Sequence, residues 1–363
     1  MPHCPWTDRH AADALVLLIL DDKLPSQLVV SQLASFLRWV DPVQTVYCIG
    51  GRSGPLGDSA AHLCSVEFLD PVLNDWRNSP EMPSPRVAAA AVALDGYLYV
   101  MGGYRDSRGR SLSSVDRFDT HGFKWGESPP MLQRRYGHCA CVLNGSIYVF
   151  GGEEQLMSER FDAIPNKWYP LPAPPVHVSA ARCAVIDEKI VLAGGCLVLP
   201  PGSLEKANDR IYIFDPVCES WHSSQVRLCP ARTAFGLTVE SDSLLLTAGF
   251  VLDDGREVEV GTSQRISKSL LLTGATEDDS FPAPEVCSPR GGCLSVSVPG
   301  GVTLLLGGER ETADYTNKLF DEPLKLSGKL GWRQGDLPRM KTARTAFSAC
   351  AGPFWPECRR CRL

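Results

Sequence analysis

The sequence contains no apolar run long enough to cross a membrane. The longest such run near the N-terminus, Ala14–Leu20, has seven residues, whereas a helix that spans a bilayer needs about 20. Acidic residues stand before this run, at Asp8 and Asp13, where a signal peptide would carry basic residues. The sequence therefore predicts a protein without a cleaved signal and without a membrane partner.

An excess of positive charge is also missing. The 36 Lys and Arg residues are outnumbered by 42 Asp and Glu, so the net charge is −6. A nucleic-acid-binding domain usually presents a basic stripe or patch, and the sequence has no such Lys/Arg cluster. We therefore expect no nucleic-acid partner. Apolar residues make up 44% of the chain and charged residues 21%, a balance that allows a sizeable core and excludes global disorder.

Cysteine is too sparse for a disulfide scaffold, at 14 residues in a chain of 363. Several cysteines lie within apolar, strand-like segments, where a thiol behaves as a small apolar side chain. These are Cys48, Cys139, Cys141, Cys183, Cys293 and Cys350. Buried, reduced thiols are typical of the cytosol. The sequence therefore predicts a cytoplasmic protein, with the nucleus as the alternative location.

The sequence shows no constellation of catalytic or metal-binding residues. Its seven histidines are scattered, with no HExxH pair, and no GxSxG nucleophile turn occurs. Cys358 and Cys361 form a CxxC pair without the second pair that a zinc site needs. We therefore expect no metal, no cofactor and no catalytic residue, and hence a protein that is not an enzyme.

What the sequence has instead is a repeated glycine doublet. Six times a short apolar segment ends in two small residues, as in Tyr148–Gly152, and the fifth copy has Ala248–Gly249. The second glycines lie 43 to 59 residues apart, a period typical of repeat architectures. Glycine at a strand end permits positive φ angles and close approach of backbones. The anchors predicted from the doublets are Gly50, Gly51, Gly102, Gly103, Gly151, Gly152, Gly194, Gly195, Gly307 and Gly308.

Two further residue types recur in step with the doublets. A tryptophan follows an aspartate by six residues in four units and by eleven residues in the last unit. These predicted anchors are Trp76, Trp125, Trp168, Trp221 and Trp332. An arginine stands before a small-residue strand in five units, at Arg86, Arg135, Arg232, Arg290 and Arg344. Each unit of about fifty residues thus has room for four short strands, the content of one propeller blade.

The glycine doublet, the tyrosine or equivalent before it and the spaced tryptophan resemble the kelch repeat, over about residues 43–352. The repeats and the resemblance predict an all-β fold, a six-bladed kelch β-propeller. The first unit, entered at Thr45, lacks an innermost strand, and Ala343–Cys350 at the other end supplies one. The N- and C-terminal segments are therefore expected to pair and to close the ring, which leaves no open sheet edge.

The sequence predicts three regions. Residues 1–41 form a helical extension, residues 42–352 the propeller and residues 353–363 a C-terminal tail. In the extension, Ala11–Leu20 and Ser26–Val40 have the pattern of two apolar helices. We interpret it as a helical cap or as the remnant of a BACK-like module, because kelch-like proteins carry BTB and helical domains ahead of the propeller. We expect no BTB domain in this chain.

The resemblance also implies a partner-binding face. In kelch-like substrate receptors, arginines at matching positions bind acidic peptide motifs. The implied face contains Arg86, Arg135, Arg232, Arg290 and Arg344 with Arg52, Tyr104, Tyr136, Phe235 and Phe347. The fourth unit departs from the pattern, because Val178 stands at the arginine position and Arg182 follows four residues later. The alternative is that the arginines join neighbouring blades, since every blade needs the same joint.

The function that follows is a non-enzymatic protein-interaction module, in its most specific form a substrate receptor for a cullin-type ubiquitin ligase. Its expected partners are a protein with a short acidic motif and components of the ligase. An actin-associated or other structural kelch protein is one alternative. A sugar-modifying propeller enzyme is the other, because an epimerase would need only arginines and acids in its pocket.

Overall fold

The computed structural model describes residues 43–54, 61–70, 73–106, 109–153, 157–200, 203–273, 283–286, 288–298, 302–311, 317–326, 332–333 and 337–354. The predicted helical extension, residues 1–41, lies outside the described residues. The predicted C-terminal tail also lies outside them from residue 355 onward. The three predicted region boundaries therefore stay predictions.

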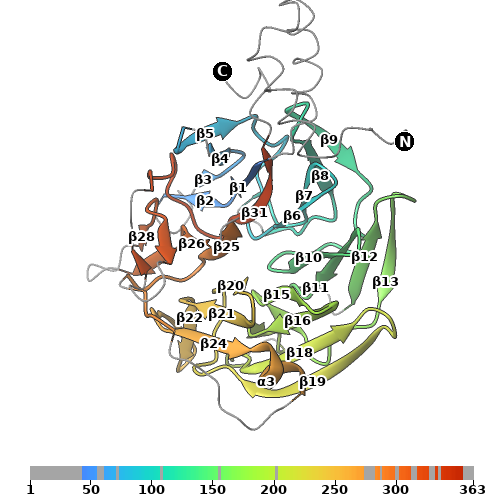
Figure 1. The fold of residues 1–363 in the computed structure, drawn as a ribbon, viewed down its shortest axis with the longest axis vertical. Coiled ribbons are helices and arrows are strands. Elements are labelled where there is room, and N and C mark those ends of the chain that lie inside the picture. The colour runs from blue at the N-terminus through green and yellow to red at the C-terminus, as the bar shows by residue number, and fades with distance from the viewer. Residues whose placement is uncertain are drawn as a thin grey trace, which may run out of the picture. The chain divides into compact units, whose positions relative to one another are not determined.

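Six small antiparallel sheets, the blades, are arranged around a central axis (Figure 1). From the axis outward, blade 1 contains β31 (Ser348–Phe354), β1 (Val43–Ile49), β4 (Val66–Asp70) and β5 (Asp75–Ser79). Blade 2 contains β6 (Ala90–Leu94), β7 (Tyr97–Met101), β8 (Val115–Asp119) and β9 (Lys124–Ser128). Blade 3 contains β10 (Cys139–Leu143), β11 (Ser146–Phe150), β12 (Ser158–Asp162) and β13 (Lys167–Leu171).

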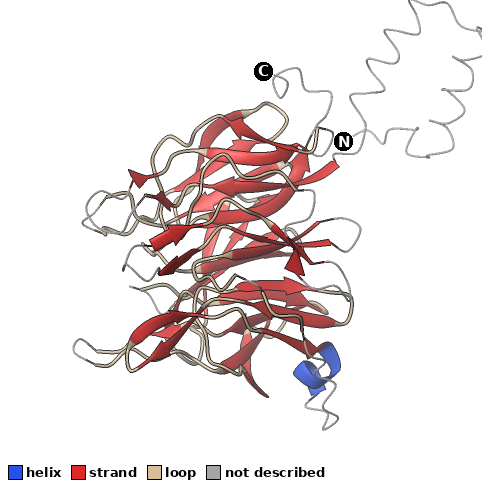
Figure 2. Cartoon of the chain, turned by 90° about the vertical axis from the view of Figure 1, so that its left-hand side faces the viewer, coloured by secondary structure: helices blue, strands red, loops and turns tan. Residues whose placement is uncertain are grey.

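The second half of the ring follows the same order with one shorter blade. Blade 4 contains β15 (Arg182–Ile186), β16 (Lys189–Ala193), β18 (Arg210–Asp215) and β19 (Ser220–Arg227). Blade 5 has three described strands, β20 (Gly236–Val239), β21 (Ser243–Thr247) and β24 (Ser263–Ser267), and α3 (Lys268–Thr273) follows them. Blade 6 contains β25 (Leu294–Val298), β26 (Val302–Leu306), β29 (Leu324–Leu326) and β30 (Trp332–Arg333). Strands and loops make up nearly all of the described chain (Figure 2).

The ring closes through pairing of the two ends of the chain, as the sequence predicts. Strand β31 is hydrogen-bonded beside β1 in blade 1, where the C-terminal red strand meets the N-terminal blue strand (Figure 1). The Tyr47 hydroxyl donates to the Pro353 carbonyl at 2.9 Å and strengthens the same seam. The predicted all-β, six-bladed propeller closed by its terminal segments is therefore confirmed.

The apolar core lies between the blades rather than within one. The second strand of each blade is buried on both faces, as in β11, where four of five side chains are buried. Facing blades interlock through aromatic pairs such as Tyr99 with Phe161, whose ring centroids are 5.7 Å apart. Phe150 of blade 3 meets Trp221 of blade 4 edge to face at 5.3 Å. A second strand packed on both sides needs a continuous apolar run, which explains the segment before each doublet.

The fixed aspartate–tryptophan spacing has a structural explanation. The aspartate ends the third strand and its carboxylate accepts a turn N–H, as in Leu73 to Asp70 at 3.0 Å. Six residues after the aspartate, the indole N–H donates to a proline carbonyl that follows the preceding blade. These bonds are Trp76 to Pro338, Trp125 to Pro80, Trp168 to Pro129 and Trp221 to Pro172, at 2.8 to 3.2 Å. The tryptophans therefore join blades at their outer edges as well as filling space between them.

The sixth unit lacks this outer bond. Trp332 is 5% exposed, but its indole N–H has no acceptor among the residues that the structure describes. In this unit the tryptophan stands eleven residues after Asp321 instead of six.

We expect Trp168→Phe to lower the free energy of unfolding by about 1 kcal/mol, because the ring stays buried while the bond to the Pro129 carbonyl is lost. Urea denaturation of the whole chain measures the change. Tyr169→Phe on the same strand is the control. Equal losses in the two variants would mean that the indole bond contributes nothing.

Candidate partner-binding face

One end of the propeller carries the loops that follow the glycine doublets, and we call it the loop face. Three of these loops form two-stranded ribbons of their own, β2 (Arg52–Ser53) with β3 (Ala61–His62), β22 (Phe250–Asp253) with β23 (Arg256–Glu259), and β27 (Glu309–Glu311) with β28 (Asn317–Leu319). In blade 4 the loop strand β17 (Cys196–Leu197) pairs instead with β14 (Val178–Ser179), which precedes the innermost strand. In blade 2 the corresponding loop, residues 104–114, pairs through the Tyr104–Ser111 bridge. Exposed loops on a rigid scaffold are where binding residues are usually found.

A backbone hydrogen bond at each second glycine holds the loop face together. The N–H of that glycine donates to the carbonyl at the start of the next blade. The six bonds, 2.8 to 3.0 Å long, are Gly51 to Arg86, Gly103 to Arg135, Gly152 to Val178, Gly195 to Arg232, Gly249 to Arg290 and Gly308 to Arg344. At Gly103, with φ of +81°, a Cβ atom would lie 2.7 Å from the Val87 carbonyl oxygen. Only glycine permits this approach.

The repeated arginines complete the same joint with their side chains. In each case Nη1 donates to the carbonyl of the first residue of the doublet in the same blade. The bonds are Arg86 to Gly102, Arg135 to Gly151, Arg232 to Ala248, Arg290 to Gly307 and Arg344 to Gly50, at 2.7 to 3.2 Å. Each arginine therefore bonds to the blade before it through its backbone and to its own blade through its guanidinium.

The first three blades neutralise the buried guanidinium with an acid. Arg86 pairs with Asp116 at 2.9 Å, and Arg135 and Arg344 pair with the fully buried Glu159 and Glu67. In blades 5 and 6 the arginine has other contacts. Arg232 donates to the Thr262 carbonyl at 2.8 Å, and the Arg290 guanidinium lies 3.8 Å from the centre of the Phe320 ring. Without a carboxylate, burial lowers the pKa of Arg232 to about 10.

This geometry corrects the predicted partner-binding ring. Arg86 is 2% exposed, and Arg135, Arg232, Arg290 and Arg344 are 0% exposed. Phe235 and Phe347 are also buried, beneath the glycine doublets of their neighbours. Seven predicted face residues are thus inaccessible, and the five arginines are the blade joints of the alternative interpretation. The repeat pattern pointed to these residues because every blade needs them for its own hydrogen bonds, which does not make them a binding surface.

The fourth unit keeps the joint by another route. The Val178 carbonyl accepts from Gly152, which confirms the match of this position to the arginines. The side-chain role falls to Asn208, whose Nδ2 donates to the Gly194 carbonyl at 3.0 Å. Sequence reasoning missed Asn208 because it lies after the doublet rather than before it. Arg182 instead donates to the Phe235 and Cys293 carbonyls of blades 5 and 6.

Three predicted face residues are accessible, and they meet at one place. Tyr104 packs edge to face on Tyr136, with ring centroids 5.4 Å apart, and on His62 at 5.8 Å. Arg52 pairs with Glu309 at 2.9 Å and keeps a side chain that is 26% exposed. We call Tyr104, Tyr136 and His62 the aromatic cluster. His62 was missed because it does not recur with the glycine doublets, the tryptophans or the arginines of the repeat.

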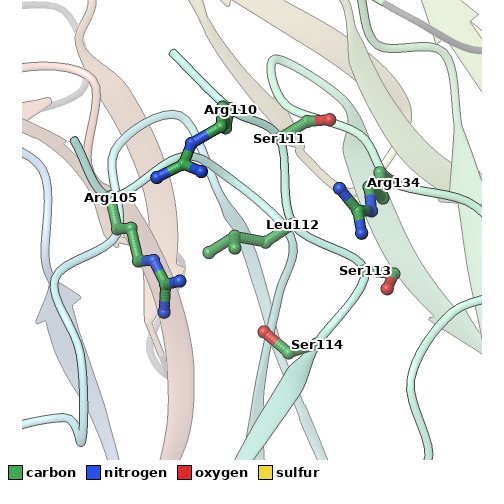
Figure 3. Close-up of a pocket in the computed structure, with 7 residues that line it drawn as sticks. All are labelled: Arg105, Arg110, Ser111, Leu112, Ser113, Ser114 and Arg134. Atoms are coloured by element: carbon green, nitrogen blue, oxygen red, sulfur yellow. The ribbon is translucent and has the colours of Figure 1, made fainter. Parts of the chain in front are cut away.

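Next to this cluster lies a cavity of about 370 Å³ that sequence reasoning did not find. Figure 3 shows three arginine side chains around Leu112, at its rim. The lining residues, which we call the arginine pocket, are Arg105, Arg110, Ser111, Leu112, Ser113, Ser114 and Arg134. The Tyr104–Ser111 bridge connects the pocket to the aromatic cluster. These arginines lie in loops outside the repeated pattern, so no period could reveal them.

The charges of the loop face are divided between two sides. In the arginine pocket, Arg110 pairs with Asp106 at 2.9 Å. The structure gives the exposed Arg105 and Arg134 no ion pair with any residue that it describes. On the ribbons of blades 4 to 6, Glu257 is exposed, and partial desolvation together with the neighbouring carboxylates of Glu309 and Glu205 raises its pKa. An anion is therefore favoured at the arginine pocket and opposed at these glutamates, which we call the acidic sector.

Other site types find no support in the described part of the chain. No group of three His, Cys, Asp or Glu side chains there is placed to hold a metal ion. No helix within the described ranges is long and apolar enough to span a membrane. The side chains that the loop face does present include guanidinium groups, hydroxyls and aromatic rings, which can bind a ligand.

Comparisons with known proteins agree with the fold. The family described as "KLHDC2/KLHL20/DRC7 Kelch-repeats domain" matches residues 89–260, and the family described as "Kelch motif" matches residues 44–83. Kelch-like protein 33 of Homo sapiens is 38% identical over 90 residues, which are 25% of this chain and 16% of that protein. Beta-scruin of Limulus polyphemus is 39% identical over 69 residues, 19% of this chain and 7% of that protein.

A solved structure extends the similarity to most of the propeller. The structure described as "Structure of YjhT" aligns with a TM-score of 0.61 over 80% of this chain and 98% of that one, at 15% identity. At this identity the likeness shows the fold alone. The curated relatives are matched over less than a quarter of their length.

We expect Arg135→Met to lower the free energy of unfolding by at least about 3 kcal/mol, because it strands the buried Glu159 carboxylate. Arg105→Met, on the surface of the arginine pocket, should change it by less than about 0.5 kcal/mol. Urea denaturation compares the two variants. Similar small losses would return Arg135 to the list of candidate binding residues.

We expect the buried His138 to make the stability of the protein sensitive to acid. Burial and the guanidinium groups of Arg135 and Arg86 lower its pKa to about 3. As the pH falls from 6.5 to 4.5, the imidazole takes up a proton in the unfolded chain but stays neutral in the native protein. The free energy of unfolding therefore falls by about 2–3 kcal/mol through this group. His138→Gln should remove that part of the slope in urea denaturation at the two pH values. A variant whose stability falls as steeply as the parent's would contradict the assignment.

Proposed function

Because this chain is a kelch-repeat β-propeller protein, we propose that it is a non-enzymatic protein-interaction module whose loop face binds a partner. In its finer form, the partner contributes a short acidic segment, and the arginine pocket and the aromatic cluster hold it. One observation carries the proposal. Three arginines converge on one cavity beside half-buried aromatic rings, on the end of the propeller that carries the loops after the doublets.

The chemistry of the pocket fits carboxylates. Guanidinium groups bind carboxylates with two parallel hydrogen bonds, and these charge-assisted bonds are shorter and stronger than neutral ones. Among the described residues, Asp106 forms an ion pair with only one of the three arginines, Arg110. Tyr104 and Tyr136 offer large, rigid contact surfaces of the kind that dominate binding energy at interfaces. An acidic segment with a neighbouring apolar residue therefore matches both parts of the site.

The acidic sector gives the bound segment a direction. Carboxylates of the partner are repelled from Glu257 and its neighbours and attracted to Arg105 and Arg134 across the face. Like charges brought together at an interface cost several kcal/mol and suppress wrong orientations. The acidic part of the partner should therefore lie over blades 2 and 3.

The ubiquitin-ligase role is a finer proposal that rests on the resemblance to kelch-like proteins. In that role the loop face would select the substrate, and a cullin or BTB protein would be contacted elsewhere on the protein. The proposed location is the cytoplasm, with the nucleus as the alternative. No observation on the described residues favours an actin-associated role or a sugar-modifying activity, so both stay alternatives from the sequence.

The test is affinity capture of partners by the intact chain from cytosol, read by mass spectrometry. The pocket variant is Arg105→Ala with Arg134→Ala. The matched control, Arg256→Ala with Arg310→Ala, removes the same charge from exposed arginines on the same face over blades 5 and 6. We expect the pocket variant to lose at least about 90% of a specific partner, a tenfold weakening worth about 1.4 kcal/mol. The control should retain it.

Two outcomes would contradict the proposal. Partners retained by the pocket variant would place binding away from these arginines. Partners captured through segments without acidic residues would remove the acidic-motif form and leave only the interaction module. Cullin or BTB proteins among the partners that survive in both variants would support the ligase role, and their absence from every capture would count against it.

A further inference from the structure

The arginine pocket holds more positive charge than a single carboxylate neutralises. Arg105, Arg110 and Arg134 line it, and Asp106 is the one carboxylate that pairs with any of them in the described ranges. The pocket thus carries a net charge of about two positive units. Burying one carboxylate there would leave one guanidinium without a counter-charge, which is unfavourable wherever a partner excludes water.

The acids beside the pocket already form ion pairs with the buried arginines of the blade joints. Asp116 pairs with Arg86 at 2.9 Å. Glu159 pairs with Arg135 and also accepts the N–H groups of Leu132 and Gln133, at 2.6 and 3.2 Å. Neither carboxylate can turn toward the pocket without leaving a buried arginine unpaired. The positive charge of the pocket is therefore fixed by the fold.

The same bonds hold the pocket in shape. Glu159 anchors the backbone of Leu132 and Gln133, the two residues before Arg134. On the other wall, the Arg135 N–H donates to the Leu112 carbonyl at 3.1 Å. Arg134 and Leu112 are thus presented from backbone segments tied to the buried joint. A site held in its bound geometry before the ligand arrives loses less entropy on binding.

Hydroxyl donors add to the arginines. Ser114 is exposed, and its Oγ accepts a hydrogen bond from Arg86 Nη2 at 2.8 Å. Because that bond uses a lone pair of the oxygen, the Ser114 hydroxyl proton remains available for an acceptor in the pocket. Ser113 lines the cavity beside it (Figure 3). The pocket therefore presents forked guanidinium donors and hydroxyl donors to one ligand.

A phosphate monoester matches this arrangement better than a carboxylate. At pH 7 it carries a charge of about −1.5 to −2 and three strong acceptor oxygens, against a charge of −1 and two oxygens for a side-chain carboxylate. We infer that the arginine pocket binds a phosphoserine or phosphothreonine within the partner's acidic segment, so that phosphorylation of the partner controls its capture. This inference rests on the proposed function and names the group that the same site recognises.

The test uses three pools of degenerate peptides with acidic flanks, which differ only at a central serine, glutamate or phosphoserine. Their binding to the full chain is measured by fluorescence anisotropy at fixed ionic strength. We expect the phosphoserine pool to bind at least about tenfold more tightly than the glutamate pool, since one further charge-assisted bond is enough for this. Its affinity should also rise between pH 5.5 and 7.5 as the phosphate loses its second proton, whose pKa is about 6.

Variants locate the effect. Arg105→Gln with Arg134→Gln should abolish the preference for phosphoserine, and Arg256→Gln with Arg310→Gln should preserve it. Arg134→Lys keeps the charge and removes the fork, so it should reduce the preference without abolishing it. Because Arg105 and Arg134 are exposed, all of these variants should fold, and the melting temperature of each checks this.

The failures of the two proposals are distinguishable. Equal binding of the phosphoserine and glutamate pools, lost in the pocket variant, would overturn the phosphate inference and leave the acidic-segment proposal standing. A phosphoserine preference that survives in the pocket variant would also overturn the inference, because the phosphate would then bind elsewhere. If none of the three acidic pools bound to the chain, both proposals would fall.

Discussion

The propeller depends on one joint, made six times around the loop face. The second glycine of each doublet donates its N–H to a carbonyl of the next blade, and in five units the arginine that carries this carbonyl donates its guanidinium to the first position of its own doublet. A single arginine thus pairs the N–H at one strand end through its own carbonyl and the carbonyl at another strand end through its guanidinium. The tryptophan–proline bonds join the same neighbouring blades at their outer edges.

This joint separates the residues that build the fold from those that can bind. The repeated arginines are all buried, because each blade boundary has the same backbone groups to hydrogen-bond. The accessible chemistry of the loop face belongs to residues that do not repeat, such as Arg105, Arg110 and Arg134. The two sets are still connected, since Glu159 holds both the buried Arg135 and the backbone beside Arg134. Loss of a joint should therefore also distort the binding surface.

The sequence predicted the blade number, the doublets and the closure, because glycine at a positive φ and tryptophan at a fixed distance from a turn have few structural alternatives. It could not decide the place of the arginines. A recurring Arg before a small-residue strand suits a surface ring and a buried joint equally, and the deciding carboxylates, Asp116 and Glu159, follow at irregular distances across loops of different length. Asn208 escaped for a similar reason, because it reaches the same carbonyl from the opposite side of the doublet. The arginine pocket could not be predicted from the sequence, because its lining residues come together only in the folded loops.

The pairing of β31 with β1 determines when blade 1 can be completed during synthesis. Tyr47 finds its acceptor at Pro353, 306 residues away along the chain, so blade 1 stays without its innermost strand until residues 348–354 have been synthesised. Contacts of such sequence separation carry a high entropic cost of loop closure and form slowly. During that interval β1 exposes an unpaired edge that other strands could occupy. The strand that completes blade 1 is thus made after the other described strands of the ring, and it covers the edge of β1.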